Sequence, residues 1–519
     1  MASPAILDGH TLDPATVERI ALAGVEVALD QQALAAVESN RNSLDRAIAQ
    51  GEEIYGVTTG LGALVTERVP ASELAGIQRY ILRSSAAGVG APLPREVVRA
   101  AVAIRLNGLL RAHSAVRSVV LERIAALLNA DLVPYVPSKG SLGASGDLAP
   151  SAHAFLPLIG EGEFLDRDGG RLPAEGLLAE RGFKPLTLQP KEALALINGT
   201  HFMTAIGSLL VLRVARLLDS ADGAAAMTLD ALRGFATPFD PRVHALRPVP
   251  GQARSAANIR ALVAGSERVG SRPEDVQNAY SLRCVPQVHG AAREAHDFFT
   301  RLVSIDLNAV TDNPLVFDNP PEVLSAGNFH GQPLALAFDT LRIALADLTT
   351  ISDRRSFRLV SPSLNGDLPP FLTRHAGHCG YMMAQYTGLA LVAELKVLAQ
   401  PVSIDSAPTS DNQEDHVSMG MTGALLSADA CALAETVLAV EALLAAQGLE
   451  TGEAEPGEGV ARLWELVRRQ VPPLDEDRPP GADIEAVCEV IRTGEFAGIV
   501  ADVSRTEREG ETQGGPQWQ

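Results

Sequence analysis

The chain has 519 residues, of which 46% are hydrophobic and only 4% aromatic, so its core must be built mainly from Leu, Ala and Val. Such a composition suits helices that pack closely through small side chains. The formal net charge is −20. Because no cluster of Lys and Arg accompanies it, this charge argues against nucleic acid and anionic membranes as partners.

Cysteine spacing and the first residues bear on where the protein works. The cysteines are far apart, which predicts free thiols and neither a zinc site nor a disulfide framework; they are Cys284, Cys379, Cys431 and Cys488. Residues 1–20 lack a basic start followed by an apolar run. No uncharged apolar stretch approaches the roughly 20 residues that span a bilayer. We therefore expect a cytoplasmic protein.

Short helices are expected in residues 1–50, one of them beginning at Asp13-Pro14, because proline is favoured in the first helical turn. Residues 51–65 are rich in Gly and Thr and predict a loop. Residues 94–130 carry apolar side chains at helical spacing and predict further helices.

The loop at 51–65 contains Tyr55-Gly56-Val57-Thr58-Thr59-Gly60-Leu61-Gly62. It has neither the Gly-Lys-Ser/Thr of a phosphate-binding loop nor the glycine spacing of a dinucleotide fingerprint. It is either an ordinary loop or a mobile lid that brings the Tyr55 phenol to a site. A phenol has an ordinary pKa of about 10, and it accepts a proton only where positive charge or hydrogen bonds stabilise its anion.

Residues 131–162 predict a loop region with a short helix after Asp147, and the tripeptide Ala144-Ser145-Gly146 lies at its centre. Such a tripeptide can cyclise. The Gly146 nitrogen attacks the Ala144 carbonyl, and loss of two waters, one from the Ser145 hydroxyl, leaves a methylidene-imidazolone (MIO) ring. This ring is an electrophile, which no unmodified side chain offers. Taken alone, the tripeptide favours an ordinary turn in which Asp147 caps the next helix.

Beyond this loop, Asp166-Arg167-Asp168-Gly169-Gly170 predicts a turn between two small strands. Long helices are expected at about 191–233, 253–265, 273–309, 331–358, 376–400 and 418–447. We divide the chain into an N-terminal domain with the Ala-Ser-Gly loop at 1–200, a central bundle of long helices at 201–456, a C-terminal helical segment at 457–504 and a disordered tail at 505–519.

Polar residues stand inside these helical segments. Asn198 lies among Leu and Ile, where it is either a satisfied core residue or part of a site. Gln277 and Tyr280 are spaced to share a helix face, and Arg283 lies one turn further. Arg283 could hold a carboxylate in two parallel hydrogen bonds, or it could be a surface residue paired with Asp or Glu.

Two further segments, Gly327-Asn328-Phe329-His330-Gly331 and Asp411-Asn412-Gln413-Glu414-Asp415-His416, could be polar loops with helix caps. The Glu-Asp-His run invites a metal. However, no His-Glu-x-x-His or comparable set accompanies it, so we expect no metal site.

Residues 140–150, Gly-Ser-Leu-Gly-Ala-Ser-Gly-Asp-Leu-Ala-Pro, resemble the signature of the aromatic amino-acid ammonia-lyase and aminomutase family. With this resemblance the cyclised tripeptide becomes the expected form. Five motifs agree in order, from about residue 50 to residue 500. Within the family, the segments 277–284 and 412–416 look most like histidine ammonia-lyases, because phenylalanine and tyrosine lyases typically lack glutamate at the Glu414 position.

The resemblance implies a role for each matching residue. The substrate amine is expected to bond to the methylidene carbon derived from Ser145, and Tyr55 is expected to remove the β-proton. Arg283 would bind the substrate carboxylate with help from Asn198. Of the other matching residues, Tyr280 and Gln277 would line the ring, Phe329 would contact substrate and ring, and Glu414 would meet the imidazole or the amine. No external cofactor is implied.

One departure bears on the substrate. Histidine ammonia-lyases carry histidine at the Ser85 position, and tyrosine lyases carry it at the Ser84 position, whereas this chain has serine at both. The usual selector of the side chain is therefore missing, and we expect a roomier or differently polar pocket. Lesser departures are Leu61, where phenylalanine is usual, and His201, where glutamine is usual.

The family fold is nearly all α: a bundle of long, roughly parallel helices with a smaller N-terminal domain that carries the MIO loop. It forms a homotetramer whose active sites draw residues from three subunits. The resemblance implies an ammonia-lyase for an L-amino acid, with the conversion of histidine to urocanate as the leading candidate. A 2,3-aminomutase, a lyase for another aromatic or non-aromatic amino acid, and a non-catalytic protein that keeps the scaffold stay open as alternatives.

Overall fold

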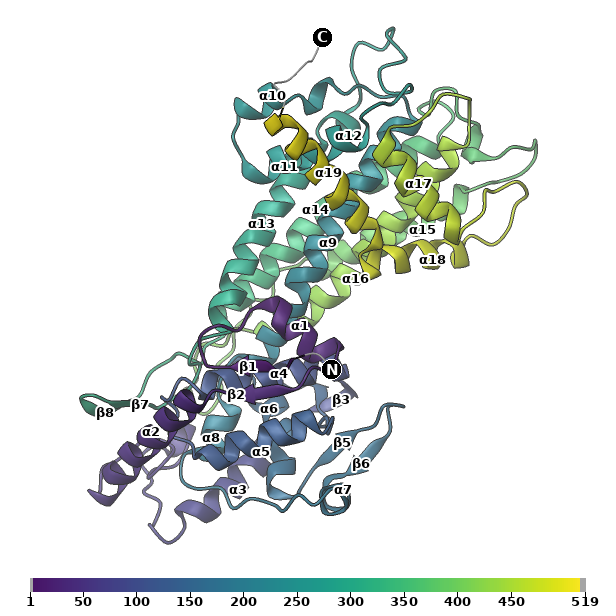
Figure 1. Cartoon of the computed structure of the whole chain (residues 1–519). Helices are drawn as coiled ribbons and strands as arrows, with labels where there is room; N and C mark the ends of the chain where they lie inside the picture. Colours follow the sequence, from purple (N-terminus) through teal and green to yellow (C-terminus); the bar gives the residue numbers. More distant parts are fainter. Residues whose placement is uncertain (1–2, 514–519) are drawn as a thin grey trace. The chain divides into compact units, whose positions relative to one another are not determined.

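The computed structural model describes residues 3–513, with side chains described as far as residue 506. The protein is mostly helical, as expected (Figure 1). It divides into two compact units, each built from three separate stretches of sequence. Unit 1 consists of residues 1–212, 299–339 and 401–425, and unit 2 consists of residues 213–298, 340–400 and 426–519.

Four of the five unit boundaries fall inside long helices, which are α9 (His201–Ala231), α13 (Val285–Asp306), α14 (Gln332–Val360) and α16 (Gly420–Leu449), and the fifth follows residue 400, just beyond the end of α15 (Met382–Leu398). The structure therefore divides the chain differently from the boundaries we placed at residues 200 and 456. Hydrophobic periodicity continues without a break along one helix, so it gives no signal where that helix leaves one unit.

Unit 1 combines short helices with paired strands. Its helices are α1 (Pro14–Leu22), α2 (Gln31–Ala49), η1 (Gly62–Leu64), α3 (Leu74–Ser85), α4 (Arg95–Leu109), α5 (Ser118–Asn129), α6 (Leu148–Phe155), η2 (Leu156–Ile159), α7 (Ala174–Glu180) and α8 (Glu192–Ile197). Strands β1 (Ala5–Leu7) and β2 (Val27–Leu29) pair in parallel. The antiparallel pairs are β3 (Val89–Pro92) with β4 (Pro137–Lys139), β5 (Glu163–Leu165) with β6 (Arg171–Pro173), and β7 (Leu315–Asp318) with β8 (Pro321–Leu324). The turn predicted at 166–170 joins β5 to β6.

Two of the expected long helices are interrupted near site residues. The helix expected at 191–233 breaks between α8 and α9, where Gly199 has a φ of +121° that favours glycine. Asn198 ends α8 with extended backbone and is not inside a helix. The helix expected at 273–309 begins only at α12 (Tyr280–Arg283), after extended backbone at Ala279. Gln277 therefore lies in the preceding loop and does not share a helix face with Tyr280.

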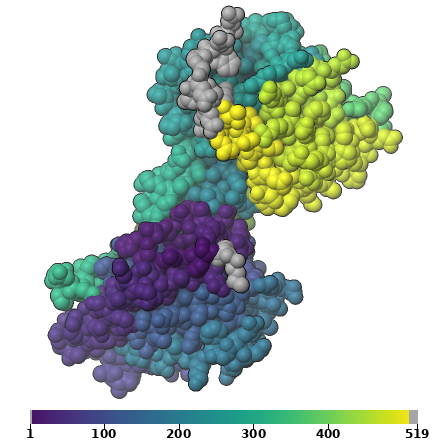
Figure 2. All heavy atoms as spheres, in the orientation of Figure 1, coloured from purple at the N-terminus to yellow at the C-terminus, as the bar shows by residue number. Residues whose placement is uncertain are grey.

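Unit 2 also contains η3 (Thr237–Phe239), α10 (Pro241–Ala245), α11 (Pro250–Leu262), η4 (Pro370–Leu372), α15 (Met382–Leu398), α17 (Glu458–Gln470), α18 (Gly481–Thr493) and α19 (Glu495–Gln513). Helices α17 to α19 pack together and form a continuous yellow-green surface in Figure 2. The backbone of α19 is helical as far as Gln513, where we expected a disordered tail from residue 505. Its Glu and Arg residues favour helix, and Arg505 pairs with Asp502 one turn earlier. Residues 514–519 lie outside the described part of the chain.

Buried ion pairs join the long helices within unit 2. Asp222 on α9 accepts hydrogen bonds from His289 Nδ1 at 2.7 Å and from Arg293 at 2.6 Å, both on α13. Burial alone would raise the pKa of Asp222, but the Arg293 guanidinium and the His289 hydrogen bond lower it below its usual range. Arg355 on α14 pairs in the same way with Glu441 on α16. Because an unpaired buried charge is costly, each pair favours the alignment of its two helices that keeps the charged partners in contact.

Helices α9 and α16 are each long and apolar enough to cross a membrane by length and composition alone. However, 72% and 61% of their most apolar windows are buried inside the protein. This burial is what core helices of a large bundle require.

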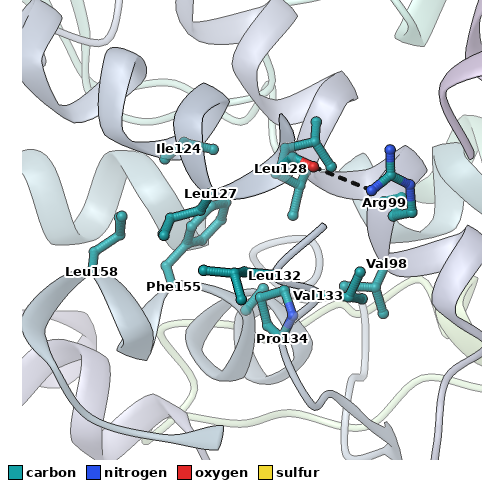
Figure 3. A pocket seen from close by; sticks show the side chains of 12 residues that line it. Val98, Arg99, Ile124, Leu127, Leu128, Leu132, Val133, Pro134, Phe155 and Leu158 are labelled. Atoms are coloured by element: carbon teal, nitrogen blue, oxygen red, sulfur yellow. Dashed lines mark hydrogen bonds between the residues drawn. The ribbon is translucent and has the colours of Figure 1, made fainter. Parts of the chain in front are cut away.

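A small apolar cavity of about 20 Å³ lies between α4 and α5 in unit 1 (Figure 3). Leu128 lines it and is 4% exposed. We expect Leu128→Ala to lower the free energy of unfolding by about 2–5 kcal/mol, because it enlarges a cavity that is already present. Val119→Ala on the exposed side of the same helix should change stability by no more than about 0.5 kcal/mol. Urea denaturation of both variants checks this, and equal effects would contradict it.

Candidate active site

The Ala-Ser-Gly loop follows strand β4 and ends at helix α6 in unit 1. Gly143 and Gly146 have φ values of +71° and +77°. A Cβ on Gly143 would lie 2.2 Å from Ser418 Oγ, and one on Gly146 would lie 2.1 Å from the Gly199 carbonyl oxygen. Both positions therefore require glycine.

Backbone contacts hold this loop against the break between α8 and α9. Gly199 N–H donates to the Ser145 carbonyl at 3.2 Å, and Asp147 N–H donates to the Gly199 carbonyl at 2.7 Å. Among the described residues the Gly146 N–H donates to no acceptor. The nitrogen that cyclisation would use is thus free of a competing hydrogen bond, and the residues present fit an MIO group.

Asp147 caps α9 and not the helix that follows it in sequence. Its Oδ2 accepts from the backbone N–H groups of Phe202 at 2.9 Å and Met203 at 3.0 Å, whereas α6 receives no side-chain cap. Burial raises the pKa of Asp147 to about 7, although these two donors act in the opposite direction. Its Oδ1 is buried without a partner among the described residues.

A cavity of about 640 Å³ opens beside the loop, and all its lining residues belong to unit 1. The predicted site residues that line it are Tyr55, Ser85, Ser145, Asn198, Phe329 and Glu414. They come from the 51–65 loop, the end of α3, the Ala-Ser-Gly loop, the end of α8, the segment before α14 and the segment before α16. The fold therefore gathers six residues that are far apart in the sequence.

Glu414 and Tyr55 approach the cavity with defined hydrogen bonds. Ser145 Oγ donates to Glu414 Oε1 at 3.2 Å, and Thr409 Oγ1 donates to Glu414 Oε2 at 2.9 Å. No described Lys, Arg or His lies within ion-pair distance of Glu414. The Gly62 N–H donates to Tyr55 Oη at 3.0 Å, which fixes the position of that oxygen.

The structure places Gln277, Tyr280 and Arg283 in unit 2. Gln277 and Arg283 line a separate cavity of about 350 Å³, and the Arg283 guanidinium lies 4.6 Å from the centre of the Tyr280 ring. Arg283 Nε is buried without a hydrogen-bond partner, and no described Asp or Glu pairs with this side chain. Tyr280 is 70% exposed. The guanidinium is therefore a cation without a counter-ion in its own unit.

The family model described as aromatic amino acid lyase matches residues 12–469. The chain belongs to this family. It is 45% identical over 505 residues to a histidine ammonia-lyase of Myxococcus xanthus, a match that covers 96% of this chain and 99% of the relative. Among solved structures, the tyrosine aminomutase of Streptomyces globisporus superposes with a TM-score of 0.92 at 39% identity, covering 96% and 98% of the two chains. The histidine ammonia-lyase of Trypanosoma cruzi gives 0.89 at 36% identity, covering 96% and 95%.

Membership of the aromatic amino acid lyase family confirms the resemblance inferred from residues 140–150, and it identifies the chain as a carbon–nitrogen lyase. The mostly helical fold agrees with these neighbours. For this lyase, three sequence departures can now be located. Ser85 and Leu61 line the cavity, so both bear on its shape. His201 is buried, bonds to Ser151 at 2.8 Å and is not among the residues that line the cavity.

Ser84 does not line the cavity, and its hydroxyl donates to the Ile81 carbonyl within its own helix at 3.3 Å. Cavity residues that sequence reasoning missed include Glu53, Thr59, Asn313 and Gln413. Thr59 and Gln413 stand inside the motifs at 55–62 and 411–416 but were given no role, and Glu53 stands two residues before the first of these motifs. Asn313 had no such signal.

Proposed function

We propose that this lyase releases ammonia from an L-amino acid, with histidine as the leading substrate and cytoplasm as the compartment. The observation that carries the proposal is the cavity that brings Ser145, Tyr55, Asn198, Phe329 and Glu414 together. Relatives at 45% identity that bear the name histidine ammonia-lyase support it.

We infer that Ala144, Ser145 and Gly146 cyclise to the MIO group. The free Gly146 N–H, the two positive-φ glycines and the position of Ser145 at the cavity support this step. When formed, the group supplies an electrophile that makes the substrate amine a better leaving group.

Each neighbouring side chain then has a distinct task. Tyr55 Oη receives the β-proton, and the Gly62 N–H, which donates to this oxygen, holds it in position. Glu414 accepts hydrogen bonds from the imidazole N–H or from the amine. Phe329 packs against the substrate and excludes water, which strengthens these polar contacts.

We propose that Arg283, Tyr280 and Gln277 act in the cavity of another copy, within a homotetramer. A carboxylate-binding cation is lacking among the residues that line the cavity, whereas the Arg283 guanidinium lacks a counter-ion. Exposed apolar residues along α15, namely Met383, Tyr386, Leu389 and Val397, support burial against another copy.

The experiment that tests the activity is a screen of the twenty amino acids for ammonia release, with identification of the carbon product. An α,β-unsaturated acid plus free ammonia is expected. A β-amino acid would establish the alternative, a 2,3-aminomutase, the kind of enzyme named for the Streptomyces globisporus structure with a TM-score of 0.92. The absence of turnover on every amino acid would contradict both.

We expect Ser85→His to raise kcat/KM on histidine by about tenfold. A second imidazole at this point of the cavity can hydrogen-bond to the substrate ring, and one such bond to a polar partner contributes about 1.5 kcal/mol. Ser84→His is the matched control, because the Ser84 hydroxyl bonds to its own helix and does not line the cavity. Steady-state kinetics on histidine would contradict the expectation if both variants behaved like the wild type.

A further inference from the structure

A buried ion pair contacts the side chain of Asn198. Lys191 Nζ bonds to Asp312 Oδ2 at 2.7 Å, and both side chains are fully buried. Neither residue lines the cavity, whereas Asn198 does. A second cation, Arg105, lies 3.9 Å from the same carboxylate oxygen.

The other oxygen of Asp312 fixes the Asn198 amide. Asn198 Nδ2 donates to Asp312 Oδ1 at 3.4 Å and to the Asn313 carbonyl at 2.9 Å, so both of its hydrogens are used. The reversed amide would set the Asn198 oxygen against a carboxylate and a carbonyl, which is repulsive. Among the described residues Asn198 Oδ1 accepts from no donor, and it is not a buried unpaired atom. Asn198 Oδ1 is therefore open to a hydrogen-bond donor bound in the cavity.

Building on the proposed function, we propose that Lys191 and Asp312 are positioning residues that turn the carbonyl oxygen of Asn198 toward the substrate. Asn198 then accepts a hydrogen bond from the substrate amino group and cannot donate one to the carboxylate. Arg283 then binds the substrate carboxylate without help from Asn198. This differs from the role that family resemblance suggested for Asn198.

The cost of the pair supports a positioning role. Burying two charges is expensive, and apolar side chains of similar size often give the same or greater stability. A buried pair next to a site residue therefore offers little as a source of stability. What it does supply is a fixed acceptor, Asp312 Oδ1, which also takes the Asn313 N–H at 2.7 Å.

Two double variants separate positioning from stability. Lys191→Met with Asp312→Asn removes both charges but keeps a carbonyl that accepts from Asn198. Lys191→Met with Asp312→Leu removes the acceptor as well. Both variants are assayed with the amino acid that the wild type deaminates. We expect the kcat/KM of the variant with Asp312→Asn to stay within about threefold of the wild-type value. The kcat/KM of the variant with Asp312→Leu should fall at least about tenfold, which corresponds to the loss of one fixed hydrogen bond. Similar kcat/KM values in both, at similar thermal unfolding midpoints, would overturn the proposal.

A second measurement tests the proposal even if the variant with Lys191→Met and Asp312→Leu does not fold. Histamine keeps the amine of histidine and lacks the carboxylate, and 3-(imidazol-4-yl)propanoate has the reverse pattern. We expect Asn198→Ala to weaken inhibition by histamine at least about fivefold and to change inhibition by the propanoate less than about twofold. A larger effect on the propanoate, equal effects, or no effect on either would refute the amine contact.

The experiments distinguish an incorrect choice of histidine as the substrate from an incorrect role for Asn198. If neither compound inhibits the wild type, histidine is the wrong side chain, and the amine and acid derived from the amino acid found in the screen take their place. The comparison of the two double variants is unaffected, because it requires only ammonia release.

Discussion

Ser145→Ala is expected to reduce ammonia release by at least about 1000-fold while the thermal unfolding midpoint stays close to that of the wild type. Without the Ser145 hydroxyl the second water cannot be lost, and no unmodified side chain offers an electrophile. The Ser145 side chain is only partly buried and its one hydrogen bond, to Glu414, faces the cavity, so folding should not depend on it.

Mass spectrometry gives the independent readout for this prediction. The wild-type peptide that contains residues 144–146 should be lighter than its sequence by two water molecules. Ser138→Ala on strand β4 is the control, because it removes a serine hydroxyl that does not line the cavity. An unmodified mass in active wild-type enzyme would refute the MIO assignment.

The same variant tests which copy supplies Arg283. Co-expression of Ser145→Ala with Arg283→Ala should restore part of the activity, because mixed assemblies contain some cavities with both residues intact. Ser145→Ala with Tyr55→Ala should restore none, since both residues line one cavity in unit 1. Recovery in neither pair would mean that Arg283 and Ser145 of one chain serve the same site.

Sequence reasoning predicted the helical class and most helices, because 3.6-residue periodicity is a local property. Sequence reasoning failed to predict helix interruptions that depend on tertiary contacts. The break at Gly199 is set by the Asp147 N–H and the Ser145 carbonyl, which come from a loop some fifty residues earlier. The interruption before Tyr280 likewise depends on extended backbone at Ala279 that no periodic pattern encodes.

The candidate site was predictable to the extent that chemistry is carried by short motifs. Tyr55, Ser145 and Glu414 could be named because each stands in a recognisable string, and the cavity contains all three. Lys191 and Asp312 could not be named, because their significance lies in a 2.7 Å contact between segments 121 residues apart. Nor can one chain's sequence indicate that Arg283 has no counter-ion in its own unit.

Tyr55→Phe is the second change with a large expected effect: a loss of about 100-fold to 10,000-fold in kcat, the usual worth of a positioned general base. KM should change little, because the ring remains in the cavity. The Gly62 N–H loses its acceptor, which costs about 1 kcal/mol of loop stability and does not explain the larger loss in rate.

The Tyr55→Phe test measures kcat together with exchange of the substrate β-hydrogen in deuterated water. Both should fall in parallel if Tyr55 Oη is the atom that takes the proton. Tyr80→Phe on α3, where the side chain is 63% exposed, is the matched control and should leave both rates unchanged. Loss of turnover with undiminished β-hydrogen exchange would show that another group removes the proton and that the Tyr55 hydroxyl serves a different step. Of the described acids that line the cavity, Glu53 and Glu414 would then be the groups to examine.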